Sequence, residues 1–122
     1  MMMMSDLARL SLESEGDVEL ARVAGEVDAS NVDDLSRRLL SSVSNKARGL
    51  VLDLTETSYI DSSGISLIFD AAARLRNRRQ ELRLVVSPSS FVGEVLAAVS
   101  MEQAVPIDPD VAGAMKAVGG AG

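Results

Sequence analysis

Histidine, cysteine and tryptophan are absent from this chain of 122 residues, which contains one tyrosine and two phenylalanines. Without histidine the chain lacks the usual general base at neutral pH and the commonest protein ligand of metal ions. Without cysteine it can form no disulfide, thiolate nucleophile or zinc–thiolate site. A Ser-His-Asp hydrolase is therefore excluded. We expect a protein that is not an enzyme and that holds no metal or cofactor.

Long apolar runs and an excess of positive charge are missing too. No stretch is apolar for long enough to span a membrane, and the Met1–Asp6 segment has no basic region like that of a signal peptide. The formal net charge of -6 would repel a nucleic-acid backbone. Together with the lack of disulfides, this predicts a cytoplasmic protein that contacts neither membranes nor nucleic acids directly.

The chain does contain many aliphatic residues, in an alternating order of expected strands and helices. Hydrophobic residues make up 47% of the sequence, which is enough for the core of one domain. Periodicity and turn residues predict strands at 7–12, 18–24, 49–54, 82–86 and 105–107, and helices that begin near residues 30, 62, 88 and 109. The apolar run 49–54 is typical of a strand covered on both faces, and 55–60 is expected to connect it to the next helix.

This element order predicts a single α/β domain over residues 5–118, with flexible ends at 1–4 and 119–122. We expect a mixed, mostly parallel sheet of about four to five strands with about four helices. In such a sheet the loops that follow parallel strands lie at one edge, where ligands of open α/β sheets bind. The loops that hold Asp28 and Asp61-Ser62 should therefore lie together.

Several polar residues have ordinary structural interpretations. Ser30 is expected to cap the first helix, and Asp33 and Asp34 lie in its first turn, where the helix dipole favours acidic residues. Asp53 follows a strand and can satisfy nearby backbone groups. Asp28 can be a turn residue instead of a binding residue.

Ser62 is the focal candidate for function, and the residues alone leave two interpretations open. It can cap the helix that starts there, which is the commoner role and contributes about 1 kcal/mol. It can instead be a phosphorylation switch that places close to two negative charges on a binding surface. Ser63 is the second candidate for the switch, although its hydroxyl should be less free one residue further into the helix.

Four segments resemble the STAS domain, and in particular the bacterial anti-sigma-factor antagonists. They are Gly25-Glu26-Val27-Asp28, Leu52-Asp53-Leu54, Tyr59 to Ile65, and Ser87-Pro88 before a helix. The resemblance extends from about Leu7 to the last helix. It is specific because the Asp-Ser-Ser-Gly segment occurs together with the Gly-Glu-Val-Asp segment at this distance.

The resemblance implies a function as well as a fold. Such antagonists bind an anti-sigma factor that is also a serine kinase, and this binding frees the sigma factor. The kinase phosphorylates the serine that matches Ser62, which ends the complex, and a serine phosphatase restores the free hydroxyl. The aspartates that match Asp28 and Asp61 are implicated in kinase recognition. We expect a monomer in the free state.

Ser66 departs from the family pattern, because a glycine often stands there near the partner surface. Other STAS domains occur in anion transporters, lipid-transport systems and stress-sensing assemblies and lack the serine switch. A constitutive interaction or scaffold module is therefore the alternative function, although the intact Asp61-Ser62-Ser63-Gly64 segment favours the antagonist. A nucleotide-binding or carboxylate-dependent enzyme is a third hypothesis, and the chain contains neither GxxxxGK[ST] nor GxGxxG to support it.

The position of Phe69 is open, since it lies one place off the apolar stripe of its helix. The core is the commoner place for it, and the alternative is the helix face beside Ser62 and Ser66. The predicted partner surface comprises Asp28, Asp61, Ser62, Ser63, Gly64, Ser66 and Phe69. A group of arginines is interpreted as favourable charge at a helix C-terminus, because no aromatic platform for bases accompanies it. It comprises Arg74, Arg76, Arg78 and Arg79.

Overall fold

One hairpin and a series of parallel strands form the sheet of this protein, in a computed structural model that describes residues 8–119. The elements are β1 (Arg9–Glu15), β2 (Val18–Val27), α1 (Val32–Ser42), β3 (Gly49–Ile60), α2 (Ser62–Asn77), β4 (Glu81–Val85), α3 (Phe91–Ala98), a 3₁₀ helix (Met101–Gln103), β5 (Ile107–Asp108) and α4 (Val111–Gly119). The five strands lie in sequence order across the sheet. β1 is antiparallel to β2, and the other pairs are parallel, which confirms the predicted α/β fold.

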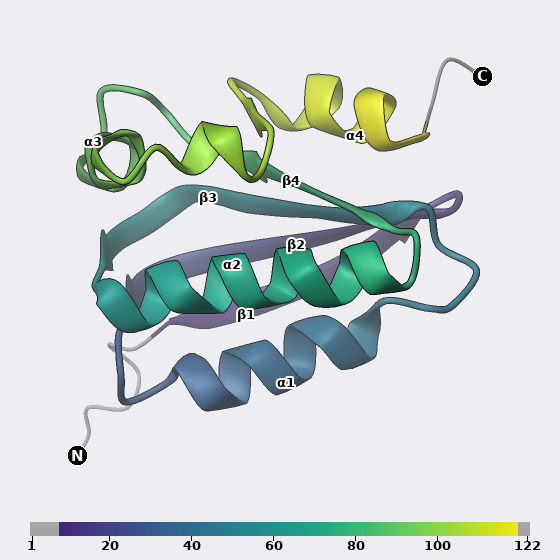
Figure 1. The fold of residues 1–122 in the computed structure, drawn as a ribbon, viewed down its shortest axis with the longest axis horizontal. Coiled ribbons are helices and arrows are strands. Elements are labelled where there is room, and N and C mark those ends of the chain that lie inside the picture. The colour runs from purple at the N-terminus through teal and green to yellow at the C-terminus, as the bar shows by residue number, and fades with distance from the viewer. Residues whose placement is uncertain (1–7, 120–122) are drawn as a thin grey trace.

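Aliphatic side chains fill the space between the sheet and its helices on both faces. α1 and α2 lie side by side over one face, and α4 lies over the other (Figure 1). The chain keeps its three aromatic side chains out of this core: Tyr59 is 41%, Phe69 40% and Phe91 51% exposed. Within residues 8–119, no helix combines the length and the apolar character needed to cross a membrane.

β3 is longer than its sequence suggests, and the prediction that 55–60 is a connection was wrong. The strand continues to Ile60 because β2 pairs with it over its whole length, up to the register pair Val27 and Ile60. The pairing is irregular near Ala24, where the register shifts. Thr57 is buried, and its hydroxyl donates to the Val23 carbonyl at 2.7 Å. Pairing with β2 thus holds this segment in a strand, although its polar sequence alone does not predict one.

The predicted boundaries of the later elements shift by a few residues. α3 begins at Phe91 because Ser90 caps it, with its hydroxyl accepting from the Gly93 N–H at 3.0 Å. β5 comprises Ile107–Asp108, where 105–107 was predicted. The last residue of α4 is Gly119, which the sequence assigned to a flexible end. The rest of the two predicted ends lies outside the described residues, as does the first residue of the predicted strand 7–12.

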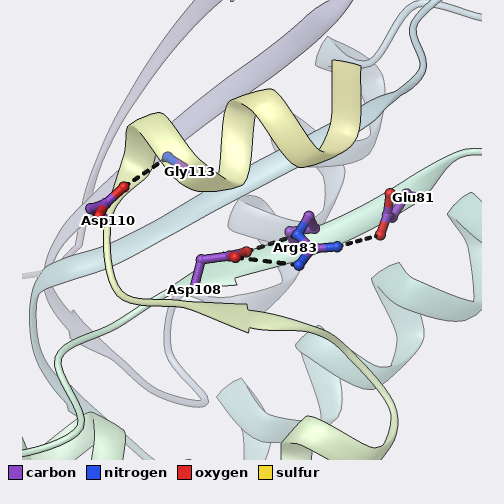
Figure 2. Close-up of polar contacts among 5 residues, drawn as sticks. All are labelled: Glu81, Arg83, Asp108, Asp110 and Gly113. Atoms are coloured by element: carbon purple, nitrogen blue, oxygen red, sulfur yellow. Dashed lines mark hydrogen bonds and ion pairs between the residues drawn. The ribbon is translucent and has the colours of Figure 1, made fainter. Parts of the chain in front are cut away.

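Arg83 joins β4 to the last strand through a pair of carboxylates (Figure 2). Its Nε donates to Asp108 Oδ2 at 2.8 Å and its Nη2 to Asp108 Oδ1 at 3.3 Å, while its Nη1 donates to Glu81 Oε2 at 2.9 Å. The side chains of Arg83 and Asp108 are only 20% and 16% exposed. The hydrogen bond to Asp108 raises the pKa of the Arg83 guanidinium above its ordinary value. This contact anchors the chain at β5, shortly before α4 begins at Val111.

Arg83→Met should lower the free energy of unfolding by about 1–2 kcal/mol, because it leaves the Asp108 carboxylate largely buried without its partner. Urea unfolding at neutral pH measures this change. Arg22→Met is the matched control: its ion pair with Glu13 spans 3.9 Å between side chains that are 51% and 58% exposed. Such surface pairs contribute about 0–1 kcal/mol. An equal loss in both variants would contradict the structural role of the Arg83–Asp108 contact.

Candidate functional site

The carboxyl ends of β2 and β3 bring Asp28 and Asp61 together, as the parallel topology predicted. Val27 and Ile60, the last residues of the two strands, are register partners. The Asp61 N–H donates to the Val27 carbonyl at 3.3 Å. The turn into α1 and the start of α2 therefore lie at the same end of the sheet, where α3 also lies (Figure 1).

Asp28 is held in the turn between β2 and α1, and this turn corrects the predicted helix cap. One carboxylate oxygen of Asp28 accepts from the backbone N–H of Ser30 at 2.9 Å and also from its hydroxyl. Asn31 takes the N-cap position, with no capping hydrogen bond from its side chain. Instead, Asn31 Oδ1 accepts from the Asp28 N–H at 3.1 Å, and Nδ2 donates to the Glu26 carbonyl at 2.9 Å. The prediction that Ser30 caps α1 was wrong, because its hydroxyl binds Asp28.

Asp61 caps α2, so the capping interpretation of Ser62 was also wrong. Asp61 Oδ1 accepts from the backbone N–H groups of Ser63 at 2.9 Å and Gly64 at 3.1 Å. Ser62 is the first residue of α2 and is exposed. Among the hydrogen bonds of residues 8–119, none involves its hydroxyl. Asp61 thus caps the helix, and the Ser62 hydroxyl remains exposed at the surface.

Gly64 lets α2 begin directly against the ends of the two strands. A Cβ atom at this position would lie 2.4 Å from Ile60 Cγ1 and 3.0 Å from Val27 Cγ1. Real Cβ atoms do not approach other atoms so closely. Gly64 is buried, so its side of the helix faces the sheet and not a partner. The close approach therefore sets how near the first turn of α2, which includes Ser62, lies to the ends of β2 and β3.

The outer face of α2 carries Ser66 and Phe69 further along the helix from Ser62. Positions 62, 66 and 69 share one face by their helical spacing, and all three residues are exposed. Phe69 is therefore not a core residue, which was its commoner expected place. Ser63 is half-buried beside this face. A shallow groove of about 340 Å³ runs between α1 and α2, lined by Val32, Asp33, Ser36, Ser63, Ser66, Leu67 and Asp70.

The structural interpretations of Asp53 and Arg74 are confirmed. Asp53 is buried, and its Oδ1 accepts from the N–H of Thr55 at 3.0 Å and from its hydroxyl at 2.8 Å. Arg74 lies in the last turn of α2, and its Nε lies 3.1 Å from Asp70 Oδ2. Neither residue needs a role in binding.

A stacked pair of aromatic rings at the same end of the sheet was missed from the sequence. The ring centroids of Tyr59 and Phe91 lie 5.8 Å apart, with 10° between the ring planes. Two observations could have indicated it: aromatic residues are rare in this chain, and Tyr59 stands two residues before Asp61. The pairing itself depends on a contact between β3 and α3, which no local pattern reveals.

The class of protein that this fold and site define is the STAS domain, and the chain belongs to the STAS domain family. The match covers residues 9–114, which is nearly all of the chain that the structure describes. An anti-sigma-B factor antagonist of Listeria monocytogenes is 42% identical over 64 residues, 51% of this chain and 54% of that protein. The chain thus spans about half the length of the curated relatives it matches.

Solved structures share this fold over most of the chain. An anti-sigma factor antagonist from Mycobacterium paratuberculosis has a TM-score of 0.83 at 19% identity, over 94% of this chain and 97% of that chain. The anti-sigma factor antagonist SpoIIAA of Bacillus, in its unphosphorylated form, has a TM-score of 0.68 at 18% identity, over 84% and 90%. At these identities the likeness establishes the fold.

Proposed function

We propose that this chain is an anti-sigma-factor antagonist. It binds an anti-sigma factor that is also a serine kinase and thereby releases a sigma factor, and phosphorylation of Ser62 ends the complex. The free, exposed hydroxyl of Ser62 at the start of α2, next to a cap supplied by Asp61, carries this proposal. The Listeria relative is an anti-sigma-B factor antagonist, and SpoIIAA also has a structure in a phosphorylated form, which supports it.

A phosphate on Ser62 would change the surface and leave the fold intact. The backbone N–H groups of Ser63 and Gly64 already bind Asp61, so they cannot also hold the phosphate. The phosphate would therefore project beside the Asp61 carboxylate and add close to two negative charges to the surface. A complex that encloses Ser62 would be opposed by this new charge and by its bulk.

The partner surface that we propose includes Asp28, Asp61, Ser62, Ser63, Ser66 and Phe69. Gly64 contributes indirectly, because it sets how closely α2 approaches the sheet. Ser63 is the second candidate for phosphorylation, and its half-buried position makes it the less accessible of the two. A serine phosphatase would restore the free form. The chain would act as a monomer in the cytoplasm, and its own role would be binding, with the chemistry done by the kinase and the phosphatase.

The decisive test is incubation with the anti-sigma kinases of the host and ATP, followed by intact-mass measurement and peptide mapping. We expect one added phosphate on Ser62 and loss of kinase binding after the addition. Ser62→Ala should abolish the modification, whereas the matched control Ser63→Ala should keep it. A phosphate on Ser63, or no phosphate with any of the kinases, would contradict the proposed switch. Stable kinase binding without modification would favour a constitutive STAS interaction module.

A further inference from the structure

Apart from Arg9, which begins β1 and pairs with Ala24, the segments that form the Ser62 end of the sheet contain no basic residue. Residues 23–36, 55–73 and 86–102 surround the carboxyl ends of β2, β3 and β4 and contain no lysine or arginine. Their acidic residues are Glu26, Asp28, Asp33, Asp34, Glu56, Asp61, Asp70, Glu94 and Glu102. Interfaces pair complementary potentials, so a protein that docks here should present positive charge.

The stacked rings of Tyr59 and Phe91 lie within this acidic end and face water. Tyr59 is the penultimate residue of β3, and Phe91 is the first residue of α3. The two rings lie nearly parallel, with 41% and 51% of the two residues exposed. The core is aliphatic and does not include these two rings. Their exposed surfaces are therefore available to another molecule.

Two carboxylates flank the rings. Glu26 of β2 is the register partner of Tyr59 and is exposed. Glu94 lies one helical turn after Phe91 on the same side of α3 and is also exposed. A cation that lies on the ring faces would therefore have an acidic side chain near each ring. Aromatic faces attract cations because the ring quadrupole is negative there.

We propose that Tyr59 and Phe91 form a platform for an arginine side chain of the protein partner, with Glu26 and Glu94 as its carboxylate neighbours. Arginine fits better than lysine because its planar, weakly hydrated guanidinium stacks on aromatic rings. The identity of the partner as an anti-sigma factor rests on the proposed function, but the preference for arginine follows from the platform. The platform belongs to β3 and α3, so it adds a contact separate from the exposed face of α2.

The test uses proton NMR with three synthetic peptides that differ only in one repeated residue: acetyl-Gly-Xaa-Gly-Xaa-Gly-amide, with Xaa as arginine, lysine or citrulline. Tyr59 is the only tyrosine of the chain and there is no tryptophan, so its ring signals are readily resolved. With the arginine peptide we expect saturable shifts of the Tyr59 and Phe91 ring signals and upfield shifts of the arginine side-chain protons. The lysine peptide should bind several-fold more weakly, and the uncharged citrulline peptide weakest.

Replacement of both rings by leucine, Tyr59→Leu with Phe91→Leu, should remove the upfield shift while keeping an apolar surface. Leu12→Ala removes an exposed apolar side chain on β1 and should change nothing. Equal binding of the arginine and lysine peptides would overturn the platform, and so would an unchanged upfield shift in the double variant. These results depend on no kinase, so they are independent of whether Ser62 is phosphorylated.

With the anti-sigma factor as ligand, the same double variant should bind about ten-fold more weakly, which lies between the values for an exposed and a desolvated cation–π contact. The single variant Tyr59→Phe should keep most of the wild-type affinity, because it keeps the ring, whereas Tyr59→Leu should not. Normal anti-sigma factor binding by the double variant would overturn the platform and leave the proposed function standing. If the anti-sigma factor does not bind the wild-type chain at all, the proposed function fails and the peptide result alone decides on the platform.

Discussion

Ser62→Asp should weaken binding to the anti-sigma factor about 100-fold, which corresponds to about 2.7 kcal/mol. A kinase places the hydroxyl of its substrate in line with the γ-phosphate of bound ATP. A carboxylate at position 62 would therefore face the nucleotide phosphates on one side and Asp61 on the other. Isothermal titration calorimetry with the anti-sigma factor and a nucleotide measures this loss.

The fold of Ser62→Asp should be unaffected. An acidic residue in the first turn gains from the helix dipole, and repulsion from Asp61 offsets this gain, so we expect a change in unfolding free energy within about 0.5 kcal/mol. Ser62→Asn is the steric control, since it has the size of aspartate without the charge and should bind well. Ser11→Asp adds the same charge on β1, an edge strand that lies two strands away from β3. Equal weakening by Ser11→Asp would mean that total charge, and not position 62, governs the complex.

The strands that consist of apolar runs were predictable, whereas the second half of β3 was not. The run 49–54 forms a strand by its composition alone, because its residues can be buried on both faces. Residues 55–60 alternate less clearly and include several polar side chains. They are in β3 because β2 continues alongside them, and Thr57 finds a carbonyl acceptor on that strand. Such long-range pairing leaves no local pattern in the sequence.

The meeting of Asp28 and Asp61 was predictable from topology, because parallel strands end at one edge. The residue that caps α2 was not predictable, because Asp61 and Ser62 are neighbours and both side chains can cap a helix. The same ambiguity misplaced the cap of α1 at Ser30. In both cases adjacent polar residues compete for the same role, and the backbone geometry of the turn decides between them.

The exposure of Phe69 shows a limit of periodicity. A residue next to an apolar stripe can belong to the core or to the surface, depending on how much of the helix its neighbours cover. Here Leu67, Ile68 and Ala71 are buried and α1 covers only one side of α2, so Phe69 stays exposed. The number and placement of neighbouring helices, which set this exposure, are properties of the whole fold.

Gly64→Ala should lower the free energy of unfolding by about 2 kcal/mol. Overpacking destabilises the fold by about 3 kcal/mol, and the higher helix propensity of alanine offsets up to about 1 kcal/mol of this loss. The new methyl group would lie 2.4 Å from Ile60 Cγ1 and 3.0 Å from Val27 Cγ1. Both side chains are buried, with 4% of Ile60 and 5% of Val27 exposed, and have little room to move. We therefore expect the start of α2 to move away from the sheet, and Ser62 to move with it. We expect a roughly ten-fold lower phosphorylation rate even under conditions where the variant is folded, because catalysis depends strongly on position.

Gly119→Ala is the matched control, since a Cβ atom there meets only Val18 Cγ2, at an ordinary 3.6 Å. It should change the unfolding free energy by less than about 1 kcal/mol. A double-mutant cycle with Ile60→Ala identifies the cause of the Gly64→Ala loss. Ile60→Ala is destabilising by itself, but it removes the atom that the new methyl group would meet. Gly64→Ala should then cost much less in the Ile60→Ala background than in the wild type. An equal cost in both backgrounds would mean that the contact with Ile60 is not what requires glycine at position 64.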